Sequence, residues 1–172
     1  MRPPLAADFD AIQAIYAHHV TTGLGSFEEV PPTVEEMLTR WRAVAAAGLP
    51  YLVAEVDGAI AGFCYARPYR ERAAYRHTVE DSVYVAPGHG RRGVGSRLLG
   101  RLIEACETLP LHRMVAVIGD RANHGSIELH RRHGFEVAGV LGEVGHKFGR
   151  WVDIVIMQRP LRGPSPPDPA AA

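Results

Sequence analysis

The sequence carries no surplus of charge of either sign. Its 19 lysine and arginine residues balance its 19 aspartate and glutamate residues, which gives a formal net charge of +0 at pH 7. A domain that binds nucleic acid or a membrane surface through its overall field has a marked excess of one sign. We therefore expect no nucleic acid and no membrane among the main partners of this protein.

Long apolar runs and signal-like segments are also absent. The longest apolar runs have the length of a strand, and the N-terminus lacks the charged-then-apolar pattern of a signal peptide. Cysteine is scarce, because Cys64 and Cys106 are the only two, and they form no Cys-x-x-Cys motif. Such isolated cysteines in apolar surroundings are typical of buried free thiols in a reducing compartment. We therefore expect a cytoplasmic protein.

The length and composition favour one domain. The chain has 172 residues, of which 47% are hydrophobic, and this is enough for a single domain with a substantial core. We assign residues 1–162 to that domain. Residues 163–172, GPSPPDPAAA, form a low-complexity segment that cannot build a core, and we expect a disordered tail there.

Hydrophobic periodicity predicts a mixed α/β fold. Apolar residues at helical spacing predict a first helix from residue 9, and Thr33 with Glu36 forms a capping-box signature that opens a second. Asp57-Gly58 is the strongest hairpin signal in the chain. The remaining expected elements are strands at 51–56, 59–66, 77–85, 114–118, 135–141 and 151–157, and helices at 94–106 and 123–134.

A glycine-rich loop, APGHGRRG at 86–93, joins a predicted strand to a predicted helix. Helix N-termini expose unsatisfied N–H groups, so this arrangement favours a phosphate-like anion, although a tight turn with solvated arginines would look similar. A P-loop is excluded because no lysine follows the glycines. The pattern Gly88-x-Gly90-x-x-Gly93 matches a dinucleotide fingerprint, but Asp120 lies too far along and too little chain remains for a second half.

Two motifs in order carry a family resemblance. The run V-Y-V-x-P-x-x-x-R-R-G-V-G-S-x-L-L resembles the pyrophosphate-binding motif of the GCN5-related N-acetyltransferases (GNAT), and residues 123–135 resemble a second motif of that superfamily. The segments RHTVEDSVYV, VAVIGDRANHGSIELH and GHKFGRWVDIVIMQR look like those of the phosphinothricin and methionine-sulfoximine N-acetyltransferases. The similarity runs from about residue 2 to residue 161.

This resemblance implies the GNAT fold, which is a mixed, mostly antiparallel central sheet flanked by helices, with acetyl-CoA as co-substrate and no metal. Gly90 departs from the pattern, because the superfamily usually has Gln or Arg there. The cofactor-binding residues that the resemblance implies are Val83, Tyr84, Val85, Arg91, Arg92, Gly93, Val94, Gly95, Ser96, Asn123 and Ser126.

Acetyl transfer to an amine requires a neutral amine, and an α-amine is mostly protonated at pH 7. A general base is worth roughly 10²–10⁴-fold in rate. Glu80 lies in mid-strand, where the pattern alone is that of a glutamate on an exposed face, but the resemblance assigns it as the catalytic base of a direct transfer. Backbone N–H groups near Val83 and Val85 resemble the thioester-binding segment, and this use of them requires a local splay or bulge in the sheet.

The resemblance implies further roles. His130 stands where many members carry a tyrosine that protonates the thiolate; a histidine there can act as the acid, assist the base, or simply pack under the cofactor. The loop at 67–76 matches the region that binds the amino-acid substrate, and arginine suits a carboxylate or phosphinate, although a solvated basic loop is the plain alternative. The substrate-binding candidates are Phe27, Arg70, Tyr75 and Arg76.

The related enzymes pair into homodimers, and the segment at 145–157 is a candidate for that interface. The small-molecule amine remains open, because another amine such as a protein N-terminus or a polyamine would suit the same fold. A non-catalytic acyl-CoA sensor is a third reading, against which the presence of Glu80 argues. An NAD-dependent oxidoreductase is the weakest of the readings.

Overall fold

Six strands and four α-helices make up most of residues 1–164, the range that the computed structural model describes. The rest of the predicted tail, residues 165–172, lies outside the described residues. Two short 3-10 turns, η1 (Ala6–Asp8) and η2 (Ala73–Tyr75), complete the list. In chain order the main elements are α1 (Phe9–Thr22), α2 (Val34–Ala46), β1 (Tyr51–Val56), β2 (Ala59–Pro68), β3 (Thr78–Val85), α3 (Val94–Cys106), β4 (Arg113–Gly119), α4 (His124–Arg132), β5 (Glu136–Lys147) and β6 (Arg150–Pro160).

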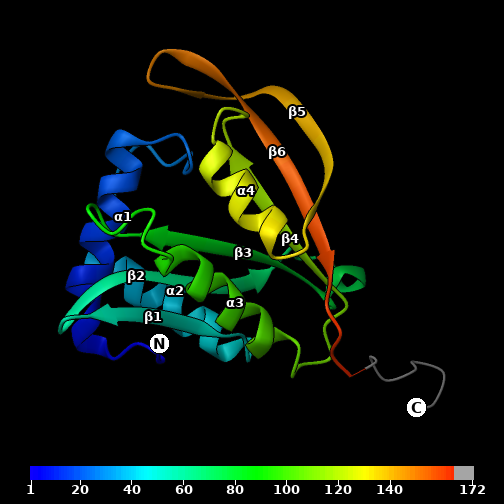
Figure 1. The fold of residues 1–172 in the computed structure, drawn as a ribbon, viewed down its shortest axis with the longest axis horizontal. Helices are drawn as coiled ribbons and strands as arrows, with labels where there is room; N and C mark the ends of the chain where they lie inside the picture. The colour runs from blue at the N-terminus through cyan, green and yellow to red at the C-terminus, as the bar shows by residue number, and fades with distance from the viewer. Residues whose placement is uncertain (165–172) are drawn as a thin grey trace.

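The strands form one sheet in the order β1-β2-β3-β4-β6-β5 (Figure 1). Every neighbouring pair is antiparallel except β3 and β4, which run parallel. The expected mixed, mostly antiparallel sheet is therefore confirmed. The hairpin at Asp57-Gly58 is present as well, with Asp57 at φ 52° and Gly58 at φ 78°, which are the left-handed angles that such a two-residue turn needs.

Helices cover both faces of the sheet. The first apolar cluster joins α3 to β2, β3 and β4, and the second joins α1 and α2 to β1 and β2. Leu98, Leu99 and Leu102 of α3 are fully buried, as their helical spacing predicts. Burial of each such side chain contributes about 1.5–3 kcal/mol. On the opposite side, Thr33 caps α2 by accepting a hydrogen bond from the backbone N–H of Glu36 at 3.1 Å, as expected.

Strands β3 and β4 part after a short parallel contact. Pairing covers only Thr78–Glu80 against Arg113–Val115. Beyond it, β3 is paired with β2 alone and β4 is paired with β6 alone, and Figure 1 shows the two strands pointing in different directions. We call this opening the fork. It is the splay in the sheet that backbone binding of a thioester requires.

The last two strands are longer than their sequence pattern predicts. β5 extends to Lys147 instead of residue 141, because it continues through two register shifts, the second of which, between Leu141 and Gly145, contains Glu143 at φ 55°. The turn at Phe148-Gly149 then leads into β6. Figure 1 shows this hairpin extending past α4.

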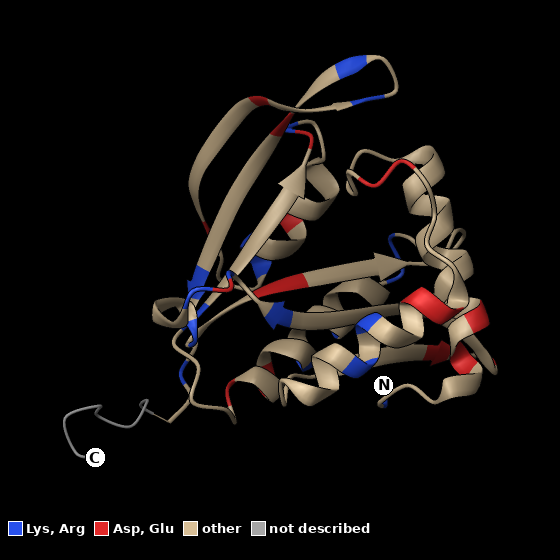
Figure 2. Cartoon of the chain, turned by 180° about the vertical axis from the view of Figure 1, so that it is seen from behind, with Lys and Arg blue, Asp and Glu red and all other residues tan. Residues whose placement is uncertain are grey.

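Charged residues of both signs are interspersed along the described chain, as Figure 2 shows. Within residues 1–164, no helix combines the length and the apolar character needed to span a bilayer.

Candidate active site

A cavity of about 1280 Å³ lies in the fork. One side is lined by Asp81 to Val85 of β3, and the other by Ala116 to Gly119 of β4, the two strand segments that no longer pair with each other. Pockets for drug-sized ligands measure about 300–1000 Å³, so this cavity suits a longer ligand. Because its walls are strand edges, they offer backbone N–H and C=O groups to whatever lies between them.

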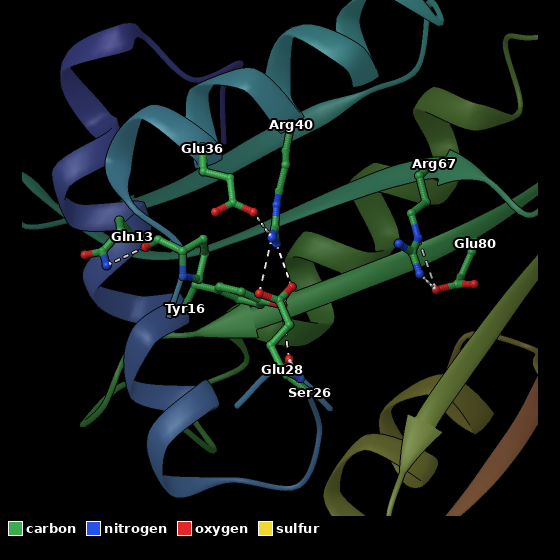
Figure 3. Close-up of polar contacts among 9 residues, drawn as sticks. Gln13, Tyr16, Ser26, Glu28, Glu36, Arg40, Arg67 and Glu80 are labelled. Atoms are coloured by element: carbon green, nitrogen blue, oxygen red, sulfur yellow. Dashed lines mark hydrogen bonds and ion pairs between the residues drawn. The ribbon is translucent and has the colours of Figure 1, made fainter. Parts of the chain in front are cut away.

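Glu80 lies at the apex of the fork. It is the last β3 residue that pairs with β4, and it is only 7% exposed, so the reading of an exposed-face glutamate is wrong. The cavity explains how a buried carboxylate is tolerated in mid-strand, since Glu80 lines it. Its cross-strand neighbour on β2 is Arg67, whose Nη2 and Nε atoms donate to Oε1 at 2.5 and 3.2 Å (Figure 3).

Arg67 was not anticipated as a site residue. Burial acts to lower its pKa, but the hydrogen bonds to Glu80 more than offset this, and the pKa of Arg67 is raised above its ordinary value. The only sequence signal was its position at the start of the basic segment 67–76.

His130 approaches the cavity from the α4 side. It is 4% exposed, and its Nε2 atom lies 3.0 Å from Oδ2 of Asp81. Its ring meets that of Phe135 edge-on, with centroids 5.0 Å apart. Both His130 and Asp81 line the cavity. Asp81 was another residue that sequence reasoning missed, although two consecutive carboxylates in mid-strand were a visible signal.

The glycine loop has the backbone of an anion-binding turn. Gly88, Arg91 and Gly93 adopt left-handed φ angles of 81°, 58° and 77°. Such angles are uncommon for a residue other than glycine, and successive N–H groups in turns of this kind form a concave site for anions. No side chain caps the N-terminus of α3. Arg91 and Arg92 are exposed and form no ion pair with residues 1–164, so both are available to a phosphate group.

The other residues expected to bind the cofactor fall into two groups. The cavity is lined by Val83, Tyr84, Val85, Asn123 and Ser126. Asn123 also caps α4, because its Oδ1 accepts from the N–H of Ser126 at 3.2 Å.

The second group lies at the start of α3, beyond the lining of the cavity. Val94 is buried in the core, so only its backbone is available to a ligand. The Ser96 hydroxyl lies 2.9 Å from Nε2 of His133. Gly95 lies close to β3, since a Cβ on it would be 3.4 Å from Val85. The cavity reaches Gly90, where a Cβ would meet nothing within 4 Å, so the site has room for a larger side chain at this position.

His19 of α1 holds the end of β3. Its Nε2 atom lies 2.9 Å from the carbonyl oxygen of Val85, and burial lowers the pKa of its ring. Because a carbonyl only accepts, Nε2 is the protonated nitrogen in this contact.

The loop between α1 and α2 places Phe27, the residue expected to form a wall of the substrate site, in the lining of the cavity. Phe27 is 40% exposed, and its ring lies on Gly145 of β5, where a Cβ would be only 2.1 Å away. The next residue, Glu28, accepts hydrogen bonds from Arg40 at 2.6 and 3.2 Å and from the Tyr16 hydroxyl at 2.8 Å (Figure 3). Burial acts to raise the pKa of Glu28, but Arg40 outweighs it and the pKa is lowered.

Lys147 fixes the same loop from the other side of the fork. It is 1% exposed, and its Nζ donates to the carbonyl oxygens of Ser26 at 2.6 Å and Gly23 at 3.0 Å. Burial lowers the pKa of its ammonium group. We call this contact the Lys147 tie. It connects β5 to the loop that follows α1, and sequence reasoning did not anticipate it.

The remaining substrate candidates lie in the basic loop. Arg70 and Tyr75 line a second pocket of about 750 Å³, which shares Arg67 and Pro68 with the main cavity. The guanidinium of Arg70 stacks 4.6 Å from the ring of Tyr69. Arg76 lines neither pocket, and its side chain donates to the carbonyl oxygen of Ala73 at 3.1 Å.

Comparisons with known proteins agree with this geometry. The model of the Acetyltransferase (GNAT) family matches residues 12–135. The chain is 57% identical over 154 residues to a phosphinothricin N-acetyltransferase of Alcaligenes faecalis, covering 90% of this chain and 78% of that protein. It is 38% identical to the L-methionine sulfoximine/L-methionine sulfone acetyltransferase of Salmonella typhimurium, with 94% of each chain covered.

A solved structure shows the same fold with its ligand. The GNAT superfamily phosphinothricin acetyltransferase from Sinorhizobium meliloti, in complex with AcCoA, superimposes with a TM-score of 0.91 at 42% identity, covering 95% of this chain and 88% of that one. The forked sheet, the uncapped glycine loop and these matches lead to one conclusion: this chain belongs to the GNAT family of acetyltransferases and is an enzyme that uses acetyl-CoA as co-substrate.

Proposed function

We propose that this enzyme acetylates the α-amine of a small amino acid analogue of the phosphinothricin, methionine sulfoximine or methionine sulfone type. Transfer is direct, from acetyl-CoA to the amine, with Glu80 as general base. The observation that carries this proposal is the buried carboxylate of Glu80 at the apex of the fork, inside the cavity and paired with Arg67. A base held there meets an amine that enters from the α1–α2 side.

The remaining roles follow from position. The thioester is held by backbone groups of Val83 to Val85, and the pyrophosphate by the glycine loop with Arg91 and Arg92. Phe27 forms a wall of the amine site, and Arg70 and Tyr75, which line the adjoining pocket, belong to the basic loop that receives a carboxylate. Arg76 lies outside both pockets and acts only through the charge of that loop. Substrates of this type share a free α-amine, a carboxylate and a tetrahedral polar group. Acetylation neutralises the amine, and we propose detoxification of such analogues as the biological role.

We also propose a homodimer that uses the β5–β6 hairpin. Trp151 is 64% exposed and Phe148 is 57% exposed, and the ring of His146 lies edge-on to Trp151 at 5.0 Å. Valine and leucine side chains of β5 are exposed on the same hairpin. Clustered apolar groups of this kind mark association surfaces.

The first test is release of free thiol from acetyl-CoA with methionine sulfone, methionine sulfoximine and phosphinothricin as acceptors. We expect turnover with at least one, and a fall in kcat of at least about tenfold in Glu80→Gln, since a general base contributes roughly 10²–10⁴-fold. Glutamine keeps the shape and can still accept from Arg67. Glu136→Gln, an exposed glutamate on β5, is the matched control and retains full activity.

The outcomes separate the two halves of the proposal. Turnover that survives Glu80→Gln removes Glu80 from its role but keeps the enzyme class. Binding of acetyl-CoA without thiol release from any of the three amines contradicts the substrate class, and favours another amine or a sensor.

A further inference from the structure

Arg67 lies where the main cavity meets the second pocket. It lines the cavity in the fork, and with Pro68 it also lines the pocket of the segment 67–76. Its side chain is 55% exposed, although it is bonded to the buried carboxylate of Glu80 (Figure 3). The guanidinium is therefore within reach of a ligand in either space.

The guanidinium of Arg67 uses only part of its donor set on Glu80. Its Nε and Nη2 atoms both donate to one oxygen, Oε1, at 3.2 and 2.5 Å. A guanidinium carries five N–H donors in a planar fork, and two of them are used in this contact. Nη1 forms no hydrogen bond or ion pair with residues 1–164. A second planar edge, formed by Nη1 and the remaining N–H of Nη2, is thus left for another acceptor.

Glu80 also has one oxygen to spare. Arg67 holds Oε1, whereas Oε2 accepts no hydrogen bond from the part of the chain that the structure describes. Because Glu80 lines the cavity, Oε2 is the oxygen that is available to an incoming amine. One oxygen of the carboxylate is fixed by Arg67, and the other can act as the base that the proposed function requires.

The other arginines around the site lack either the position or the free donors. Arg40 lines the main cavity, but both of its terminal nitrogens are bonded to carboxylates of α2 and of the loop before it. Arg70 and Arg72 line the second pocket only, and Arg76 lines neither space. Within residues 1–164, Arg67 is therefore the arginine that combines a place in the main cavity with a free terminal nitrogen.

The geometry of an α-amino acid determines which anion this free edge can bind. The α-amine and the α-carboxylate share one carbon atom, so their nitrogen and oxygen atoms lie within about 4 Å of each other. A polar group at the end of the side chain is several bonds further away. An amine that lies on Oε2 of Glu80 therefore brings its own carboxylate beside the guanidinium that holds Oε1.

Within the basic segment 67–76, we propose that Arg67 is a specificity-determining residue that binds the α-carboxylate of the acceptor through its free edge while its other edge holds Glu80. This inference rests on the proposed function and names the group by which the site recognises its substrate class. One planar cation then joins the carboxylate of the substrate to that of the base. A polyamine or a peptide N-terminus has no carboxylate on the carbon that bears the amine, so it would leave this edge unpaired.

The test compares methionine sulfone with its α-carboxamide as acceptors for the wild type and Arg67→Met. The amide keeps the amine and the side chain but removes the negative charge. We expect kcat/KM for methionine sulfone to fall on the order of 10–100-fold more in the variant than kcat/KM for the amide. The comparison of ratios cancels the different reactivity of the two amines. A role confined to holding Glu80 would lower both values equally, and that result overturns the proposal.

Arg67→Lys guards against loss of the fold, because methionine would leave the buried Glu80 without its cation. Lysine keeps the charge but lacks the planar fork. We expect Arg67→Lys to keep the circular dichroism spectrum of the wild type and to lose most of its preference for methionine sulfone over the amide, whereas an unchanged preference overturns the proposal. The matched control is Arg42→Met, at an exposed arginine of α2 that lines neither space, and it should keep the wild-type preference.

Titration calorimetry separates this inference from the proposed function. If none of the three amines is acetylated, the proposed function fails, while the binding of methionine sulfone and of its amide still tests Arg67. Tighter binding of methionine sulfone than of the amide, with the difference lost in Arg67→Lys, supports the proposal. Equal affinity of the wild type for the two compounds, or no binding of methionine sulfone, overturns it.

Discussion

Gly145 determines where the ring of Phe27 can lie. A Cβ at this position would be 2.1 Å from the ring, well inside any real contact distance. Because Phe27 is partly exposed, Gly145→Ala displaces the ring instead of unfolding the protein. We expect the KM of the amine to rise roughly tenfold or more, since small misplacements in a site are costly, while the KM of acetyl-CoA stays unchanged.

Gly139→Ala on the same strand is the matched control, because a Cβ there would meet nothing within 4 Å. Steady-state kinetics with each substrate varied in turn provides the measurement. Equal changes in both KM values would contradict the assignment of Phe27 to the amine site.

His19 makes stability depend on pH. Burial lowers the pKa of its ring below 6.5, so the folded protein favours the neutral form. As pH falls through 6.5, the unfolded chain binds this proton before the folded chain does, and the free energy of unfolding falls. The sign is opposite for His130, whose raised pKa stabilises the fold at low pH and loses that contribution as pH rises.

His19→Gln removes the first contribution. We expect the urea midpoint of the variant to change less between about pH 7.5 and pH 5.5 than that of the wild type, by chemical unfolding at each pH. If the urea midpoints of the wild type and His19→Gln change with pH in parallel, then His19 has the same pKa in the folded and unfolded chains.

At the scale of elements, the Lys147 tie joins β5 to the loop that follows α1. Lys147→Met keeps the length of the side chain but leaves the carbonyl oxygens of Gly23 and Ser26 without their donor. An unsatisfied buried polar group costs about 1–3 kcal/mol, and we expect a loss of this size in the free energy of unfolding. The matched control is Arg150→Met, a cation of the same hairpin whose exposed pair with Asp120 contributes about 1 kcal/mol or less.

Urea unfolding of Lys147→Met and Arg150→Met measures the loss of unfolding free energy in each variant. The KM of the amine should also rise in Lys147→Met, because the loop carries Phe27. Equal losses of stability in the two variants would mean that the tie contributes no more than a surface ion pair.

The elements themselves were predictable where local patterns are strong. The cap at Thr33, the hairpin at Asp57 and the apolar face of α3 each depend on residues a few positions apart, and all three are present. The length of β5 was not predictable, because glycines and bulges interrupt its alternation.

Contacts between distant segments left no local signal. The Asp81–His130 pair joins residues 49 positions apart, and the Lys147 tie spans 121 and 124 positions. The sequence pattern placed Asp81 on the correct face of β3 but offered no partner for it. The position of Glu80 at the apex of the fork was consistent with the resemblance to the GNAT enzymes, whereas its burial against Arg67 depends on the register of β2 and β3.

At the scale of the whole molecule, the exposed hairpin makes oligomeric state the property to measure. We expect the wild type to elute as a dimer and Trp151→Asp as a monomer at micromolar concentration, because the aspartate places an unpaired charge within an apolar contact. Light scattering after size exclusion gives the mass directly. Leu5→Asp, at an exposed apolar residue outside the hairpin, is the control and should remain dimeric. A wild type that is monomeric at this concentration contradicts the proposed dimer.

The Lys147 tie has a consequence for the enzyme's own chemistry. Lys147 is the only lysine in the sequence, and its amine is buried and bonded to two carbonyl oxygens. Lysine amines react with thioesters when they are neutral and accessible. An enzyme that keeps acetyl-CoA in its cleft thus hides its sole ε-amine from self-acetylation. A small amine-directed label should modify Lys147 only as fast as the loop separates from β5. The labelling rate of this one amine would therefore report the rate at which the site opens.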